Sequence, residues 1–297
     1  MARYLGPGAT QKQPHGYKPR GHAPPLEQTF SLVGTNADDY TVRASRVSVG
    51  PKSDGLVLTE NAYIHGGPRA YVHRAHSGPL GIVNSEEGYQ NLQRFLFGNR
   101  RFQIRLKFGS VCGQVSHVDD DSTLQFLLVD IAIALRGVGG YLDHRSEREM
   151  TAEPIELVRA ASANEFRPKG EKDPVLFTGY LFMNPEARLN RDDPYARWVL
   201  DLQVRPKYER VKEGLLFTSR SPFEGDAFIN DRVEFGFSET KVDKPFVYRW
   251  HSEGGDDQQP SKTTVAGTTQ QYTVPLTAPA QRFFKKVQLL IDVDAWS

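Results

Sequence analysis

Two residues near the beginning of the chain combine the side-chain types and the spacing that acid–base chemistry requires. Asp54 lies in the segment SDGLV at 53–57, and His76 follows 76 − 54 = 22 positions later, in AHSG at 75–78. A histidine that acts as a general base needs an anionic neighbour to fix its tautomer and stabilise its cation. An acid and a histidine in this order suit two adjacent strand ends, where an open α/β sheet holds catalytic side chains. On a simpler interpretation, Asp-Gly is only a favoured turn dipeptide and His76 only hydrogen-bonds a loop.

Two short strands and a helix are predicted around this pair. The apolar runs at 29–33 and 70–75 are typical of buried strands. Asn84 is the predicted N-cap of a helix, and Glu87, three residues later, completes a capping-box pattern. The apolar positions of this helix share one face and Gly98 ends it, so we expect it to pack on a sheet. These apolar positions are Tyr89, Leu92, Phe95 and Leu96.

From residue 100 onward the dominant pattern is alternation of apolar and polar side chains. It recurs at 102–108, 198–204, 233–237, 246–250, 272–276 and 287–293. Such alternation, with Gly, Pro and Asp between the segments, predicts antiparallel sheets with one solvated face. Residues 252–270 are a predicted long loop. The expected fold class is α+β and mostly β: two strands and a closing helix at 26–99, followed by an antiparallel β-sandwich at 100–297.

Composition narrows the function classes. The 37 Lys and Arg residues against 36 Asp and Glu give a net charge of +1, which argues against nucleic acid as the main partner. The single cysteine, Cys112, excludes an intrachain disulfide and a cysteine-based zinc site. Residues 1–25 are basic and rich in Gly and Pro, which predicts a disordered tail. No apolar stretch approaches the ~20 residues that a transmembrane helix needs. No secretory signal is recognisable, so the default expectation is a cytoplasmic location.

Neither of two metal-like patterns has the ligand spacing that a metal site requires. His73 and His76 are three positions apart, which on a strand places them on opposite faces. The three aspartates at 119–121 lack the spaced pattern of an EF-hand loop, and we expect them in a solvated loop. The sequence therefore predicts no metal and no cofactor.

Four segments in the first third of the chain occur in a characteristic order: LVGTN at 32–36, SDGLV at 53–57, HRAHSG at 73–78 and NSEEGYQNLQRFLFG at 84–98. Together they resemble the C-terminal part of an α/β-hydrolase, nearest to the bacterial lipases and esterases related to GPI-inositol deacylases. The resemblance covers about residues 28–99. It implies that Asp54 is the catalytic acid, that His76 is the catalytic histidine, and that the helix closes the domain. It also implies a lipid or another ester as the substrate.

The sequence departs from this family at the nucleophile. The family requires a serine within Gly-x-Ser-x-Gly, upstream of its acid and histidine. No serine here has glycine two positions away on both sides, and the nearest, Ser238, lies downstream within GFSET at 236–240. We therefore expect the C-terminal segment of a lipase- or esterase-like serine hydrolase, with an open strand edge and no activity alone. The alternative is a non-catalytic β-sandwich that serves as a binding or structural module.

Overall fold

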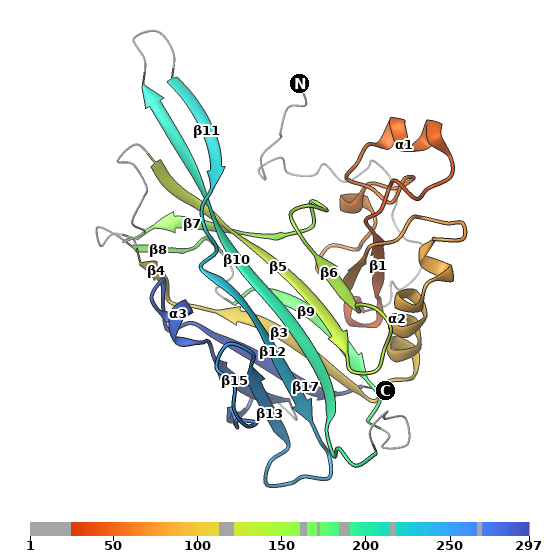
Figure 1. Ribbon diagram of the computed structural model, residues 1–297, viewed down its shortest axis with the longest axis vertical. Helices are drawn as coiled ribbons and strands as arrows, with labels where there is room; N and C mark the ends of the chain where they lie inside the picture. The colour runs from red at the N-terminus through yellow and green to blue at the C-terminus, as the bar shows by residue number, and fades with distance from the viewer. Residues whose placement is uncertain are drawn as a thin grey trace.

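A computed structural model gives the fold, and it describes residues 25–112, 122–160, 165–170, 173–183, 191–213, 218–265 and 269–296. Figure 1 shows a mostly β molecule in which long, strongly curled strands run diagonally across the body and a smaller layer with helices lies at one side. The predicted tail at 1–25 lies almost wholly outside the described residues. So does the aspartate run at 119–121.

The larger sheet is antiparallel throughout and has ten strands within the described residues. Its order is β13-β12-β10-β5-β7-β8-β4-β16, with β11 paired to β10 and β6 paired to β5. The strands are β4 (Ser110–Cys112), β5 (Ser122–Leu135), β6 (Asp143–Arg145), β7 (Glu153–Arg159), β8 (Glu165–Pro168), β10 (Ala196–Glu213), β11 (Thr218–Glu224), β12 (Ile229–Phe237), β13 (Phe246–Trp250) and β16 (Phe284–Lys285).

The second sheet is also antiparallel and has the order β14-β15-β17-β3-β9. Its strands are β3 (Arg100–Lys107), β9 (Val175–Leu181), β14 (Ser261–Thr264), β15 (Gln270–Pro275) and β17 (Gln288–Ala295), and the short helix α3 (Ala278–Gln281) follows β15. The inner faces of the two sheets share one apolar core. Across it the rings of Phe102 and Trp198 lie 5.0 Å apart, and those of Phe246 and Tyr272 lie 4.5 Å apart. The expectation of a mostly β, antiparallel fold is confirmed.

The N-terminal layer is built on two parallel strands, β1 (Ser31–Gly34) and β2 (Arg69–Val72). Its helices are η1 (Leu26–Gln28), α1 (Arg43–Val49), η2 (Thr59–Asn61), η3 (Ile82–Asn84) and α2 (Glu86–Phe97). Among the described residues these two strands form the only parallel ladder of the molecule, apart from one isolated bridge. Because parallel strands are normally covered on both faces, this layer depends on its neighbours.

Helix α2 differs from the prediction at its cap and on its apolar face. Ser85, rather than Asn84, caps the helix, and its Oγ accepts the N–H of Gly88 at 2.9 Å. The change of one position arises because Asn84 ends η3 and its amide donates to Gly78 instead. The helix buries Gly88 and Asn91. Of the predicted apolar positions, Tyr89, Leu92 and Leu96 stay 55%, 56% and 56% exposed.

Long-range contacts attach the layer to the larger sheet. The edge of β2 lies beside β6, where the backbone N–H of Tyr71 donates to the buried carboxylate of Asp143 at 2.5 Å. The amide of Asn91 on α2 donates to the Leu142 carbonyl at 2.9 Å. An aromatic cluster of Phe30, Phe95, Tyr180 and Trp296 joins the layer to β9 and to the end of the chain.

The alternation did not predict every strand, since β7, β9 and β11 lie outside the predicted segments, and β14 and β5 show why. β14 (Ser261–Thr264) lies within the predicted loop at 252–270, and all four of its residues are exposed. A strand that is exposed to solvent on both faces needs no alternation of apolar and polar side chains, so its sequence resembles that of a loop. The prediction also missed β5, whose run at 126–135 has apolar residues on both faces except at Asp130. No helix among the described residues has the length and apolar character to cross a membrane.

Candidate functional site

Asp54 sits in a tight turn that fixes its carboxylate. Its side chain is 3% exposed, and its Oδ1 accepts the N–H groups of Leu56 and Val57 at 3.0 and 2.8 Å. Gly55 has φ +94°, and a Cβ there would lie 2.2 Å from the Cβ of Tyr40, so the turn requires glycine. The Asp-Gly pair is therefore a turn, as the simpler interpretation has it, and this turn also orients the second carboxylate oxygen.

That second oxygen meets His76. Nδ1 of His76 lies 2.8 Å from Oδ2 of Asp54, and the backbone N–H of His76 donates to the Asp54 carbonyl at 2.8 Å. Because an ionised carboxylate only accepts, this hydrogen bond requires the proton of the neutral ring on Nδ1. The ring lies edge-on to Tyr40, with centroids 6.2 Å apart, and the His76 side chain is 38% exposed. The fold thus brings together the two residues that the sequence singled out.

The arrangement leaves Nε2 of His76 as the available basic nitrogen. Within the described residues no hydroxyl group hydrogen-bonds to this ring. Ser238, the nearest approach to the family's serine motif, is 1% exposed, and its Oγ lies 3.1 Å from the Thr240 hydroxyl. The pair can therefore accept a proton and stabilise the resulting imidazolium, but the described residues give it no nucleophile.

A second histidine cluster, which sequence reasoning missed, lies where the layer meets β6. Oε1 of Glu149 is 3.1 Å from Nδ1 of both His73 and His144, and its Oε2 accepts the Thr35 hydroxyl at 2.7 Å. The hydrogen bond with Glu149 raises the pKa of His144. Burial alone would raise the pKa of Glu149, but hydrogen bonds from His144 and Thr35 outweigh burial and lower this pKa. No local signal points to this cluster, because Thr35 and His73 lie at least 144 − 73 = 71 positions before His144 and Glu149.

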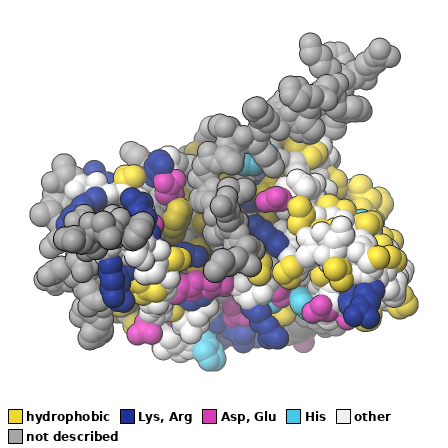
Figure 2. Space-filling model, turned by 90° about the horizontal axis from the view of Figure 1, so that it is seen from above, with side chains coloured by type: hydrophobic (Ala, Val, Ile, Leu, Met, Phe, Trp, Pro, Cys, Tyr) yellow, Lys and Arg dark blue, Asp and Glu magenta, His cyan; other side chains and the backbone are white. Residues whose placement is uncertain are grey.

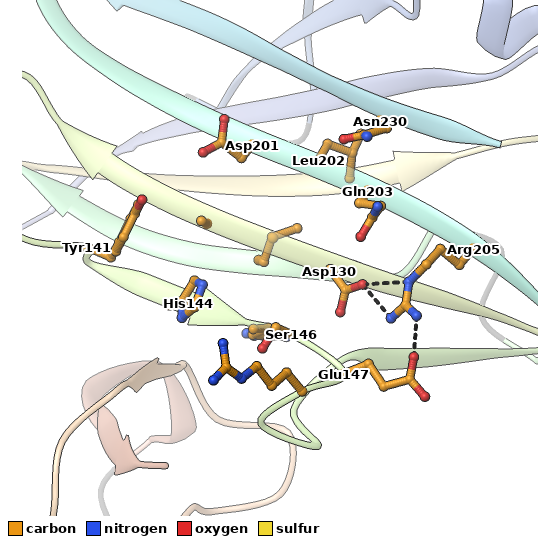
Figure 3. Close-up of a pocket in the computed structure, with 14 residues that line it drawn as sticks. Asp130, Tyr141, His144, Ser146, Glu147, Asp201, Leu202, Gln203, Arg205 and Asn230 are labelled. Atoms are coloured by element: carbon orange, nitrogen blue, oxygen red, sulfur yellow. Dashed lines mark hydrogen bonds and ion pairs between the residues drawn. The ribbon is translucent and has the colours of Figure 1, made fainter. Parts of the chain in front are cut away.

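A third cluster lies in a groove on the outer face of the larger sheet (Figure 3). Arg205 contacts three carboxylates, those of Asp130, Glu147 and Glu224. Burial, and a hydrogen bond shared with Glu147, raise the pKa of Glu224 to about 7. Burial also raises the pKa of Asp130, although Arg205 opposes the shift. The sequence offered one hint, since Asp130 interrupts an otherwise apolar run.

Among the described residues no three His, Cys, Asp or Glu side chains are grouped so that they could hold a metal ion. Comparison with known proteins adds no assignment: no protein-family model, curated protein or solved structure matches this chain. The site is therefore interpreted from its own geometry.

Proposed function

We propose that Asp54 and His76 are the acid–histidine part of a serine-hydrolase site for carboxylic esters, lipids included, and that its nucleophilic serine lies outside this sequence. The observation that carries the proposal is the 2.8 Å contact between His76 Nδ1 and Asp54 Oδ2. A buried carboxylate held by two backbone N–H groups, against an imidazole that keeps Nε2 accessible, is the arrangement a general base requires. By itself the chain then hydrolyses no ester.

The chemistry follows from the two nitrogens of the ring. When a serine hydroxyl reaches Nε2, the imidazole takes its proton as Oγ bonds to the ester carbonyl carbon. Asp54 stabilises the imidazolium that forms. His76 then returns the proton to the departing alcohol, and the acyl group stays on the serine until water, activated by the same nitrogen, releases it. Bonds and protons balance with no co-reactant besides water.

The open edge of β1 is where we propose that the nucleophile-bearing polypeptide docks. In a parallel ladder, alternate residues point their N–H and C=O groups to opposite edges. Ser31 and Thr35 donate toward β2, so Leu32 and Gly34 direct their backbone groups to the other edge. Outside the β1–β2 pair, neither residue has a backbone hydrogen bond to any described residue. A strand added parallel to β1 would pair with these groups.

Helix α2 of the same layer provides a second surface for the proposed nucleophile-bearing partner. The half-exposed side chains of Tyr89, Leu92 and Leu96 form one apolar stripe along α2, and Val83 just before the helix is 86% exposed. Figure 2, which looks down on the molecule from above, shows further apolar side chains on the right, over the N-terminal layer. The opposite edge, on β2, is already covered by Asp143, so a partner strand can join only the edge of β1. This edge lies next to Asp54 and His76, which we call the dyad. A second copy of the chain on this edge would bring no serine motif.

Reconstitution tests the proposal. The chain is coexpressed with the polypeptide encoded directly upstream of it that contains Gly-x-Ser-x-Gly, and hydrolysis of p-nitrophenyl butyrate is measured. We expect no turnover by the chain alone and turnover by the complex. Replacing Asp54 or His76 by alanine should reduce turnover by roughly 10³-fold or more. The matched control is His65→Ala, because His65 lies on the exposed surface of the same layer.

Two further readouts separate chemistry from folding. Labelling of the partner serine by a fluorophosphonate should depend on His76, while circular dichroism of the variants stays unchanged. In the isolated chain, nitrogen-15 NMR should find the His76 proton on Nδ1, and Asp54→Ala should redistribute it between the two nitrogens. Ester turnover that survives His76→Ala, or the absence of any upstream serine polypeptide, would instead favour the non-catalytic β-module.

A further inference from the structure

The groove on the outer face of the larger sheet has the form of a ligand site separate from the dyad. It has a volume of about 510 Å³ and lies between strands β5 and β10 on one side and the segment at 141–148 on the other. Figure 3 shows Asp130 and Gln203 on the sheet side, facing Tyr141, His144 and Ser146 across the opening. Asp54 and His76 are not among the lining residues.

Strand register explains both the hollow and its polar floor. Ala132 on β5 is paired with His144 on β6 and with Asp201 on β10, so a methyl group separates two larger side chains. In the next row on the same face, Asp130, Gln203 and Asn230 lie side by side across β5, β10 and β12. The small residue creates the depression, and the row beside it provides hydrogen-bonding groups.

Several of these groups have unused hydrogen-bonding capacity. Asp130 is 8% exposed, and its Oδ1 is buried without a hydrogen-bond partner in the described structure, while its Oδ2 is held by Arg205. The side-chain amides of Gln203 and Asn230 likewise make no hydrogen bond to another described residue. A buried acceptor without a partner is costly, and a ligand hydroxyl would satisfy it. Each amide both donates and accepts, as a hydroxyl does.

The charge of the lining selects a neutral ligand. The lining residues include three carboxylates, those of Asp130, Glu147 and Asp201, and three arginines, Arg145, Arg148 and Arg205. Several of these charges already neutralise one another, because Asp130 and Glu147 contact Arg205. A polyanion would meet carboxylates and a polycation would meet guanidinium groups. Neither class is favoured by a site with this balance.

One wall of the groove is aromatic. Tyr141 is 43% exposed, and its ring stacks on the His144 imidazole with centroids 5.2 Å apart and planes 19° apart. Contact with Glu149 holds His144 in place at 3.1 Å, so the stacked pair forms a fixed platform. A pyranose ring has an apolar C–H face and a rim of hydroxyl groups. The first suits an aromatic platform, and the second suits a row of amides and carboxylates.

We propose that this groove binds a neutral saccharide, with one sugar ring against Tyr141 and its hydroxyls on Asp130, Gln203 and Asn230. The inference is independent of the proposed hydrolase function. It can stand if the dyad is inactive and fail if the dyad is catalytic.

Binding to soluble sugars tests the inference. Maltohexaose, cellohexaose and N-acetylchitohexaose are titrated into the full chain, with dextran sulfate as the anionic comparison, by calorimetry and saturation-transfer NMR. We expect at least one neutral sugar to bind with a Kd of about 1 mM or lower. Tyr141→Ala and Gln203→Ala should each weaken binding roughly 10-fold or more, and Tyr141→Phe should retain it. Phe97→Ala, at an exposed aromatic side chain outside the groove, is the matched control.

The Tyr141→Phe and Gln203→Ala variants keep the inference testable if Tyr141→Ala fails to fold. The inference is overturned if none of the three neutral sugars binds at about 10 mM. It is equally overturned if dextran sulfate alone binds, or if sugar binding persists unchanged in folded Tyr141→Ala and Gln203→Ala variants.

Discussion

The carboxyl group of Asp143 should give the protein a pH-dependent stability that one substitution removes. This side chain is fully buried, its Oδ1 accepts the Tyr71 N–H, and its Oδ2 lies 3.0 Å from Nε of Arg145. Burial raises the pKa of Asp143 from 3.8 to about 6, although the positive charge of Arg145 opposes the shift. The contact also anchors β2, and with it the layer that carries the Asp54–His76 pair.

The sign and size of the effect follow from linkage. A carboxyl whose pKa is higher in the folded state keeps its proton more tightly when the protein is folded. The contribution of Asp143 to folding stability is therefore highest below the unfolded pKa of 3.8, falls as the pH rises to about 6, and stays lower above that. The difference of about 2 pKa units corresponds to roughly 3 kcal/mol at about 1.4 kcal/mol per unit. Asp143→Asn keeps an oxygen for the Tyr71 N–H and does not titrate, so this fall is absent from the variant.

Urea unfolding of both proteins between about pH 4 and about pH 7 measures the effect. The free energy of unfolding of the wild type minus that of Asp143→Asn should decrease by roughly 2 to 2.5 kcal/mol over this range, because part of the full change lies below about pH 4. Asp256→Asn, at an exposed carboxyl, controls for the loss of one acid. A difference that is constant with pH, or that increases, would refute the assignment of a protonated, buried carboxyl at this contact.

Three further predictions concern the same layer. Ser85→Ala removes the side-chain cap of α2 and should lower the free energy of unfolding by about 1 kcal/mol in urea. Gly34→Ala places a Cβ within 2.8 Å of the Asp54 Cβ, so it should destabilise the protein by about 2 kcal/mol and shift the His76 imidazole resonances; unchanged resonances would argue against the contact. For Glu149→Gln, the loss of stability should be largest between the ordinary pKa values of 4.5 and 6.5. The lowered pKa of Glu149 stabilises the folded state above pH 4.5, and the raised pKa of His144 stabilises it below pH 6.5. Thermal melts recorded across this pH range test the prediction, and an equal loss of stability at every pH would contradict it.

The sequence by itself determined the local elements and the identity of the acid–histidine pair. Alternation is a property of each strand alone, so it located β3, β10 and β17 without knowledge of their partners. The turn after α1 is equally local, since Gly55 and the backbone amides of Leu56 and Val57 fix the Asp54 carboxylate. Where local order sets a side chain, as at Asp54, sequence reasoning reaches it.

Only the tertiary structure decided what those elements face. Asp143 meets Tyr71 across 72 positions, and Glu149 meets Thr35 across 114, and neither contact leaves a local pattern. The exposed stripe on α2 and the hollow above Ala132 depend on which strands become neighbours, which is set by the packing of the whole core. Such pairings are chosen by the total apolar area removed from water, a sum over the entire chain that no single segment encodes.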